Sequence, residues 1–154
     1  MTLRGIAFAL FLSFTAVLAA QTAPRTAAPD FSGRYSFLKE GEDIQINVTD
    51  GRVDGYVTRF GDTDADQGTM LQHTFAKASL DGNNLSFTTR PVHALYYEFK
   101  GQVQRGPAKS RAEDGYYQLV GTLTEYTQKG KDVSAKSRQA TFKLFADEEE
   151  APKK

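Results

Sequence analysis

Short runs in which apolar and polar residues alternate recur through residues 31–146, and turn signals separate one run from the next. The cleanest run, at 44–48, has an isoleucine or valine at every second position, and Asp50-Gly51 follows it with the composition of a two-residue hairpin turn. Alternation with a period of two is the pattern of half-buried strands. The chain is therefore predicted to fold as an antiparallel meander of about eight strands, without a sustained helix.

The expected strands give the fold class. Three glycines fall on their inward face, and an inward glycine suits a strand that bends sharply. We therefore expect an all-β fold, an eight-stranded antiparallel up-and-down barrel, with a two-sheet β-sandwich as the alternative. The inward glycines are Gly55, Gly101 and Gly121, and the strands are expected at about 32–39, 43–49, 52–60, 69–80, 85–90, 94–104, 116–127 and 137–146.

The meander predicts one strand register and one β-bulge. With a two-residue loop at Asp50-Gly51, Val48 faces Val53 and Ile46 faces Gly55. The strand at 69–80 changes parity near Phe75–Ala76, which predicts a β-bulge there.

The first twenty residues have the composition of an export signal. Arg4 precedes a short apolar run at 6–18, and Ala19 and Ala20 supply the small residues of a cleavage site. We expect a signal peptide at 1–20, a flexible linker at 21–30, a β-barrel domain at 31–146 and a disordered charged tail at 147–154. The protein is predicted to be secreted or periplasmic, and the mature chain contains no apolar stretch long enough to span a membrane.

Composition excludes several classes of partner and chemistry. Without residues 1–20 the chain carries 18 Lys and Arg against 19 Asp and Glu, so it has no basic excess for nucleic acid. It contains no cysteine, which excludes disulfides, thiol chemistry and a lipid-modified cysteine. The sequence does not fix the oligomeric state.

The motif Gly33-Arg34-Tyr35 stands in the first expected strand. Together with the short hairpins and eight antiparallel strands, this Gly-x-aromatic motif resembles the lipocalin-like, or calycin-type, β-barrels. Lipocalins usually carry tryptophan at the third position, and this chain has no tryptophan. The nearer likeness is to small exported bacterial proteins of unassigned function that have lipocalin-like barrels.

The meander brings the loops near 39–43, 61–68, 91–93 and 128–136 to one end of the barrel. Arg59 and Glu125 follow the inward parity of their strands toward that end, where both histidines, His73 and His93, also map. A polar rim over an apolar interior is how an eight-stranded barrel takes up one small ligand. A rim ion pair between Arg59 and Glu125, with ordinary histidines, is the structural alternative.

The favoured function is non-catalytic binding of a small apolar or amphipathic molecule in the barrel. A solid-cored interaction module of the cell envelope, which binds a protein or glycan through its outer tyrosines, is the alternative, and a small enzyme at the barrel mouth is the third option. No nucleophile elbow, zinc-binding helix motif or phosphate loop is present, so no catalytic residue is assigned. The expected ligand-binding residues are Arg59, Tyr97, Phe99, Tyr117, Leu119 and Glu125.

One loop carries a metal-like pattern. Asp62, Asp64 and Asp66 alternate along residues 61–68, as carboxylates do in calcium loops. The position of the loop glycine is Gln67, and no bidentate glutamate follows at the twelfth position. A solvated acidic hairpin loop is the favoured interpretation, weak calcium binding is the alternative, and no other cofactor is expected.

Overall fold

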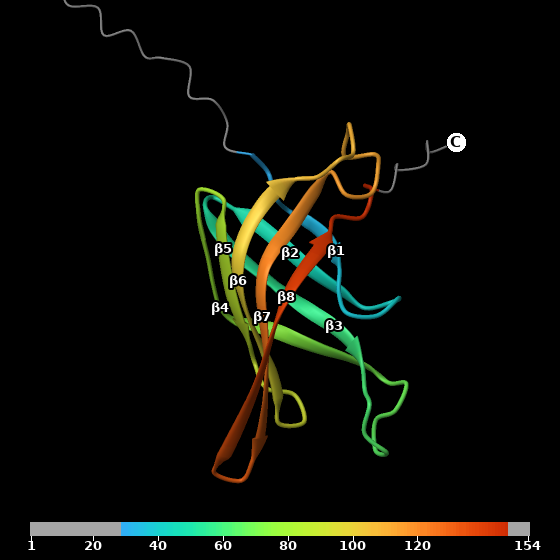
Figure 1. Cartoon of the computed structure of the whole chain (residues 1–154), viewed down its shortest axis with the longest axis vertical. Coiled ribbons are helices and arrows are strands. Elements are labelled where there is room, and N and C mark those ends of the chain that lie inside the picture. The colour runs from blue at the N-terminus through green and yellow to red at the C-terminus, as the bar shows by residue number, and fades with distance from the viewer. Residues whose placement is uncertain (1–28, 148–154) are drawn as a thin grey trace, which may run out of the picture.

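The computed structural model describes residues 29–147, which form a single eight-stranded sheet and no helix (Figure 1). Each strand pairs antiparallel with the next in chain order, which confirms the all-β meander. Within these residues no helix is long and apolar enough to cross a membrane. The strands are β1 (Gly33–Ser36), β2 (Asp43–Thr49), β3 (Arg52–Phe60), β4 (Met70–Asp81), β5 (Asn84–Thr89), β6 (Leu95–Arg105), β7 (Tyr117–Lys129) and β8 (Asp132–Lys143).

The predicted signal peptide at 1–20 lies outside the described residues, as do most of the predicted linker and the predicted tail. The described chain begins at Pro29 and ends at Asp147.

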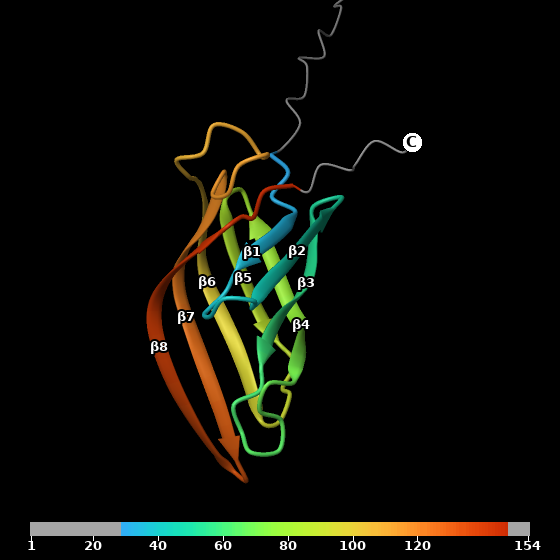
Figure 2. The same cartoon turned by 90° about the vertical axis from the view of Figure 1, so that its right-hand side faces the viewer.

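The sheet curls into a barrel that closes at one end only (Figure 2). There Tyr35 of β1 forms a bridge with Leu144, the Phe145 amide donates to the Arg34 carbonyl at 2.8 Å, and the Lys143 amide donates to Ser36 Oγ at 2.9 Å. β1 has four residues and β8 has twelve, so most of β8 has no partner on its second edge. A single curled sheet, rather than a sandwich, is the observed architecture.

The predicted registers are confirmed. Val48 faces Val53, Ile46 faces Gly55, and the register between β4 and β5 shifts between Phe75 and Lys77. The eighth strand is the main correction, because it starts at Asp132 and the expected loop at 128–136 is a tight turn. The β7–β8 hairpin extends beyond the core there, so its polar, exposed strand lacks the apolar alternation on which the prediction depended.

The closed end of the barrel is tied together by Arg111 from the β6–β7 loop. Its guanidinium donates to the carbonyls of Asp30 and Ser32, and it pairs with the Asp147 carboxylate at 2.8 Å. One side chain therefore links the segment before β1 to the segment after β8. The pKa of Arg111 is raised, mainly by its hydrogen bonds to Asp147.

Inside the barrel the core is packed with aromatic and aliphatic side chains. Phe87 stacks with Phe75 at 4.4 Å between ring centroids and with Phe99 at 5.5 Å, and Phe99 contacts Phe142 at 5.9 Å. Such close ring contacts fill the middle of the barrel with side chains. The fully buried side chains are Tyr35, Ile44, Ile46, Val57, His73, Phe87, Tyr97, Phe99, Val103, Leu119, Leu123 and Leu144.

Two of the inward glycines face each other across β6 and β7, where Gly101 pairs with Gly121. A Cβ atom added to Gly121 lies 2.5 Å from the Gly101 Cα and clashes with the Lys100 carbonyl oxygen. The strands can bend this closely around the core only because neither position carries a side chain. The inward glycines thus serve the curvature that the sequence predicted.

We predict that Gly121→Ala destabilises the fold by about 1–3 kcal/mol, because the added methyl meets backbone that cannot move aside. Chemical denaturation monitored by circular dichroism measures the free energy of unfolding. Ser134→Thr adds one methyl at an exposed position of β8 and is the matched control. Equal stability of the Gly121 variant and the parent protein contradicts the close approach of β6 and β7.

Candidate functional site

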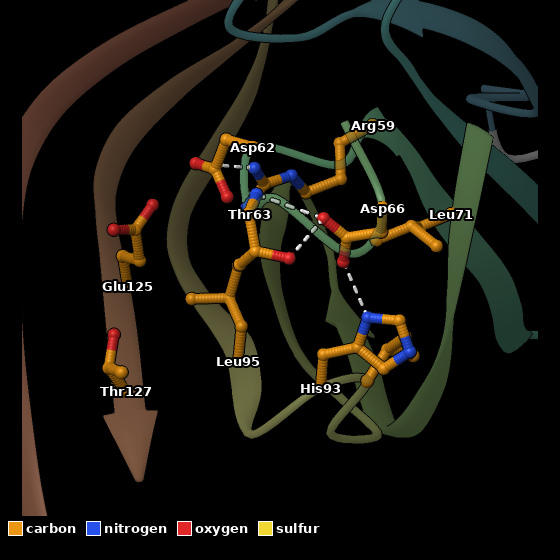
Figure 3. A pocket seen from close by; sticks show the side chains of 10 residues that line it. Arg59, Asp62, Thr63, Asp66, Leu71, His93, Leu95, Glu125 and Thr127 are labelled. Carbon is orange, nitrogen blue, oxygen red and sulfur yellow. Dashed lines mark hydrogen bonds and ion pairs between the residues drawn. The ribbon is translucent and has the colours of Figure 1, made fainter. Parts of the chain in front are cut away.

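Two adjacent hollows lie at the open end of the barrel, and they share Arg59, Asp62 and Glu125. We call the two together the mouth. The first has a volume of about 140 Å³, and Figure 3 shows its lining: the shared residues and Thr63, Asp66, Leu71, Val92, His93, Leu95 and Thr127. The second has a volume of about 240 Å³, and its lining adds Leu38, Lys39, Glu42, Tyr97 and Arg138.

Arg59 lies at the floor of the mouth, at the next-to-last position of β3. Its side chain is only 6% exposed, although it carries a charge. Its Nε donates to the Phe60 carbonyl at 2.9 Å, one terminal nitrogen donates to the Tyr97 hydroxyl at 3.0 Å, and the other pairs with Asp62 at 2.8 Å. A buried guanidinium held in this way is a fixed positive charge in a poorly solvated position.

The protonation states of this pair follow from its surroundings. Burial works against the charged form of Arg59, but the hydrogen bond to Asp62 and the contact with Tyr97 outweigh it, so the pKa of Arg59 is raised. Burial raises the pKa of the Tyr97 hydroxyl to about 12, against the opposing charge of Arg59. Tyr97 is therefore neutral at physiological pH and keeps its proton as a hydrogen-bond donor.

A hydrogen bond between side chains joins two loops above the first hollow. The Asp66 carboxylate, from the β3–β4 loop, accepts from the Thr63 amide at 2.9 Å and from the Thr63 hydroxyl, and its second oxygen lies 2.5 Å from His93 Nδ1. The hydrogen bonds to Thr63, together with that to His93, lower the pKa of Asp66 to about 2. Since Asp66 stays ionised, this contact holds the two loops together over the hollow (Figure 3).

The β5–β6 loop has an unusual backbone where it meets the hollow. His93 has a φ of 49° and Ala94 a φ of 65°, both in the left-handed region that residues with a Cβ seldom adopt. Such conformations persist where surrounding contacts enforce them, and here the Gln128 amide donates to the Ala94 carbonyl at 2.8 Å.

His73 is the unexpected residue of the site. It lies on β4 one inward position below Leu71, it is completely buried, and its ring meets Tyr97 edge-on at 5.4 Å. Neither ring nitrogen has a hydrogen-bond partner among the described residues. Burial, reinforced by the charge of Arg59, lowers the pKa of His73, while the nearby backbones of Arg90 and Leu95 oppose the shift.

The six residues expected to bind a ligand lie at three depths. Arg59, Tyr97 and Glu125 meet at the mouth, where Glu125 also lies 3.8 Å from Arg138. Phe99 and Leu119 lie deeper and are fully buried in the packed core. Tyr117 lies toward the opposite end, with its ring 5.1 Å from that of Phe31. The structure thus brings together the polar half of the expected set and separates it from the apolar half.

The three aspartates of the acidic loop have separate surroundings. Asp62 pairs with Arg59, Asp66 with Thr63 and His93, and Asp64 is exposed. Within residues 29–147 no group of three or more acidic, histidine or cysteine side chains is placed to hold a metal ion. Calcium binding by this loop stays a prediction.

Several residues of the mouth were not singled out from the sequence. Leu95 could have been included, because strand parity already placed it inward. Leu71 could not, because the parity change in the strand at 69–80 left its face undecided. Glu42 could not have been identified either, because nothing in the sequence distinguishes it from the other glutamate of its short loop. It proves to be buried, and its carboxylate accepts from the amides of Lys39 and Phe60, both at 3.1 Å.

No protein-family profile and no curated protein sequence matches the chain. Among solved structures, the rhizavidin–biotin complex is similar with a TM-score of 0.53 at 15% identity, over 73% of this chain and 98% of that chain. A second structure, of rhizavidin, has the same TM-score and identity over 79% of this chain and 86% of that chain. At this identity the likeness shows the fold alone, a β-barrel of antiparallel strands.

We predict that His73→Phe stabilises the fold by about 1 kcal/mol at pH 7.5, because it removes buried polar atoms that lack partners. Burial lowers the pKa of His73 in the folded state, so the unfolded chain binds the proton first as pH falls below about 6.5, and the parent protein loses stability there. The advantage of the variant should therefore be larger at pH 5.5 than at pH 7.5. Urea unfolding at both pH values measures it.

His73→Leu serves as a second variant in case the larger phenyl ring strains the core. If both variants are less stable than the parent protein at both pH values, the prediction is wrong, and the His73 ring has a hydrogen-bond partner in the folded protein.

Proposed function

We propose that this protein is exported and binds a small amphipathic molecule, without catalysis, at the mouth of its barrel. The buried guanidinium of Arg59 is the observation that carries the proposal. A barrel closed by strand pairing alone does not need a charge at its floor, and holding one out of water is unfavourable unless it is paired. Here it is held beside two hollows large enough for a ligand.

The position of the hollows favours the mouth over the barrel interior. Phe99 and Leu119 are fully buried among packed neighbours, and neither lines the mouth. A ligand that entered the middle of the barrel would have to displace these side chains, whereas the mouth is open without rearrangement. Apolar contacts from Leu71, Val92 and Leu95 beside the polar floor suit a molecule with one apolar and one polar part.

The rhizavidin–biotin complex supports the proposal in a general way, because that structure is of an avidin-like barrel with a small molecule. The two sequences share only 15% identity, so the ligand that this mouth accepts depends on its own residues. Export is supported by the composition of residues 1–20.

An interaction module of the cell envelope is the second candidate. It is favoured by Tyr96 and Tyr126, which stack on the outer face of β6 and β7 with ring centroids 4.7 Å apart and planes 6° apart. Paired aromatic rings on a strand surface are a common contact for proteins and glycans. On this account the mouth is only a polar end of a solid barrel.

We expect native mass spectrometry of the protein, purified from an exporting host, to show a co-purified small molecule that solvent extraction removes. Arg59→Gln should lose that mass, because it removes the fixed charge at the floor. Arg52→Gln, an exposed arginine at the start of β3, is the matched control and should keep it.

A bare mass for the parent protein and both variants contradicts ligand binding and favours the interaction module. A bound mass that Arg59→Gln retains, with unchanged thermal stability, places the ligand away from the mouth.

A further inference from the structure

We infer that the ligand is a small organic monocarboxylate and that Asp62 occupies its place on Arg59 while the mouth is empty. This inference rests on the proposed function and names its ligand class. In the empty protein the loop carboxylate forms the ion pair that the ligand carboxylate takes over on binding. Asp62 is then an internal competitor rather than a permanent partner.

Arg59 has N–H groups that its present contacts do not use. A guanidinium carries five N–H groups, and the described residues supply partners for three of them: the Phe60 carbonyl, the Tyr97 hydroxyl and Asp62. Tyr97 accepts from Arg59, and its own proton has no acceptor among the described residues. A carboxylate has two oxygens and can accept from both groups at once, in the geometry that arginine favours.

Asp62 is easily released. Its side chain is 63% exposed, and it reaches Arg59 through a single oxygen–nitrogen contact of 2.8 Å between residues three apart. Because the Asp62 carboxylate is largely in solvent, water can replace Arg59 as its partner at little cost. The buried guanidinium of Arg59 depends more on the pair, because a buried charge needs an opposite charge beside it. Another carboxylate at the same place can supply that charge instead of Asp62.

The loop remains in place when Asp62 leaves. Asp66, in the same loop, is held by Thr63 and His93, and its side chain is only 6% exposed. Backbone bonds from Gly61 to Thr69 and from Thr69 to Asp66, both 2.8 Å, close the base of the loop. Rotation of the Asp62 side chain would therefore free Arg59 without unfolding the loop. Figure 3 shows that the Asp62–Arg59 contact is separate from the Asp66–His93 contact.

The first hollow restricts both the size and the charge of the ligand. The first hollow, of about 140 Å³, matches the volume of about 150 Å³ at which a protein cavity takes up benzene. Leu71, Val92 and Leu95 line this hollow and offer apolar contacts to the ligand. Glu125 and Asp66 line the same hollow and repel any anion, more strongly as its charge rises, so the single positive charge of Arg59 suits no more than one carboxylate. A single carboxylate on a compact apolar body fits these conditions.

Benzoate, benzamide and benzylamine test the inference, because they share a ring and differ in charge. Each is titrated at pH 7 and low salt into the parent protein and into Asp62→Asn, Asp62→Ala and Asp64→Asn, and the Arg59 Nε–H signal and backbone amides are followed by NMR. Benzoate should bind in preference to the other two. Both Asp62 variants should bind benzoate roughly two- to five-fold more tightly, the factor expected from losing a weak competing ion pair.

Asp64→Asn is the matched control, because it removes the same charge from an exposed position of the same loop. It should change benzoate affinity by less than the Asp62 variants do. An equal gain for Asp64→Asn shows that general charge, not competition for Arg59, sets the affinity, and overturns the inference.

The remaining outcomes separate the two proposals. The carboxylate inference is wrong if benzamide or benzylamine binds at the mouth as tightly as benzoate does, or if the Asp62 variants bind benzoate more weakly than the parent protein. In either case ligand binding at the mouth stands. If none of the three probes shifts a mouth signal in the parent protein or the Asp62 variants, the carboxylate inference is wrong, and the co-purified mass in native mass spectrometry decides ligand binding separately.

Discussion

The seam between β1 and β8 determines how the rest of the barrel is organised. Eight strands can close only if the first and last meet, and here a four-residue strand meets a twelve-residue one. The contact between Tyr35 and Leu144 therefore closes one end, while the other end stays open. The polar mouth and the loops beside it lie at the end that this mismatch leaves open.

At the open end, polar groups occupy positions where a closed barrel would place apolar ones. Arg59 donates to the Tyr97 hydroxyl, and Asp66 fixes the loop above them. His73 lies below them with both ring nitrogens unpartnered among the described residues. Buried groups of this kind lower stability unless they are paired, so a fold maintained for stability alone has little reason to collect them at one level. Their concentration beneath two hollows is what distinguishes this end of the molecule from the packed middle.

Much of the fold could be predicted from the sequence, because strand alternation and turn composition are local properties. The Val48–Val53 register, the bulge near Phe75 and the inward direction of Arg59 and Glu125 all follow from counting residues. The start of β8 could not be predicted, since an exposed polar hairpin has no apolar period to reveal it. The separate partners of Asp62 and Asp66 could not be predicted either, because loop conformation depends on contacts with distant residues such as His93. For the same reason the sequence placed His73 only at this end of the barrel, whereas its burial without hydrogen-bond partners among the described residues is evident only in three dimensions.

The incomplete seam also has a consequence for the order in which the chain folds. Every other strand pair joins neighbours in sequence, so each hairpin can form early, but Tyr35 and Leu144 lie almost at the two ends of the sheet. Bringing them together carries the largest loss of chain entropy, which places closure late among the folding events. Until then both outer edges are free to pair with another chain. Lys136 and Arg138 on β8 discourage such pairing by their charge, so the edge that the barrel never covers is also the one that is protected against aggregation.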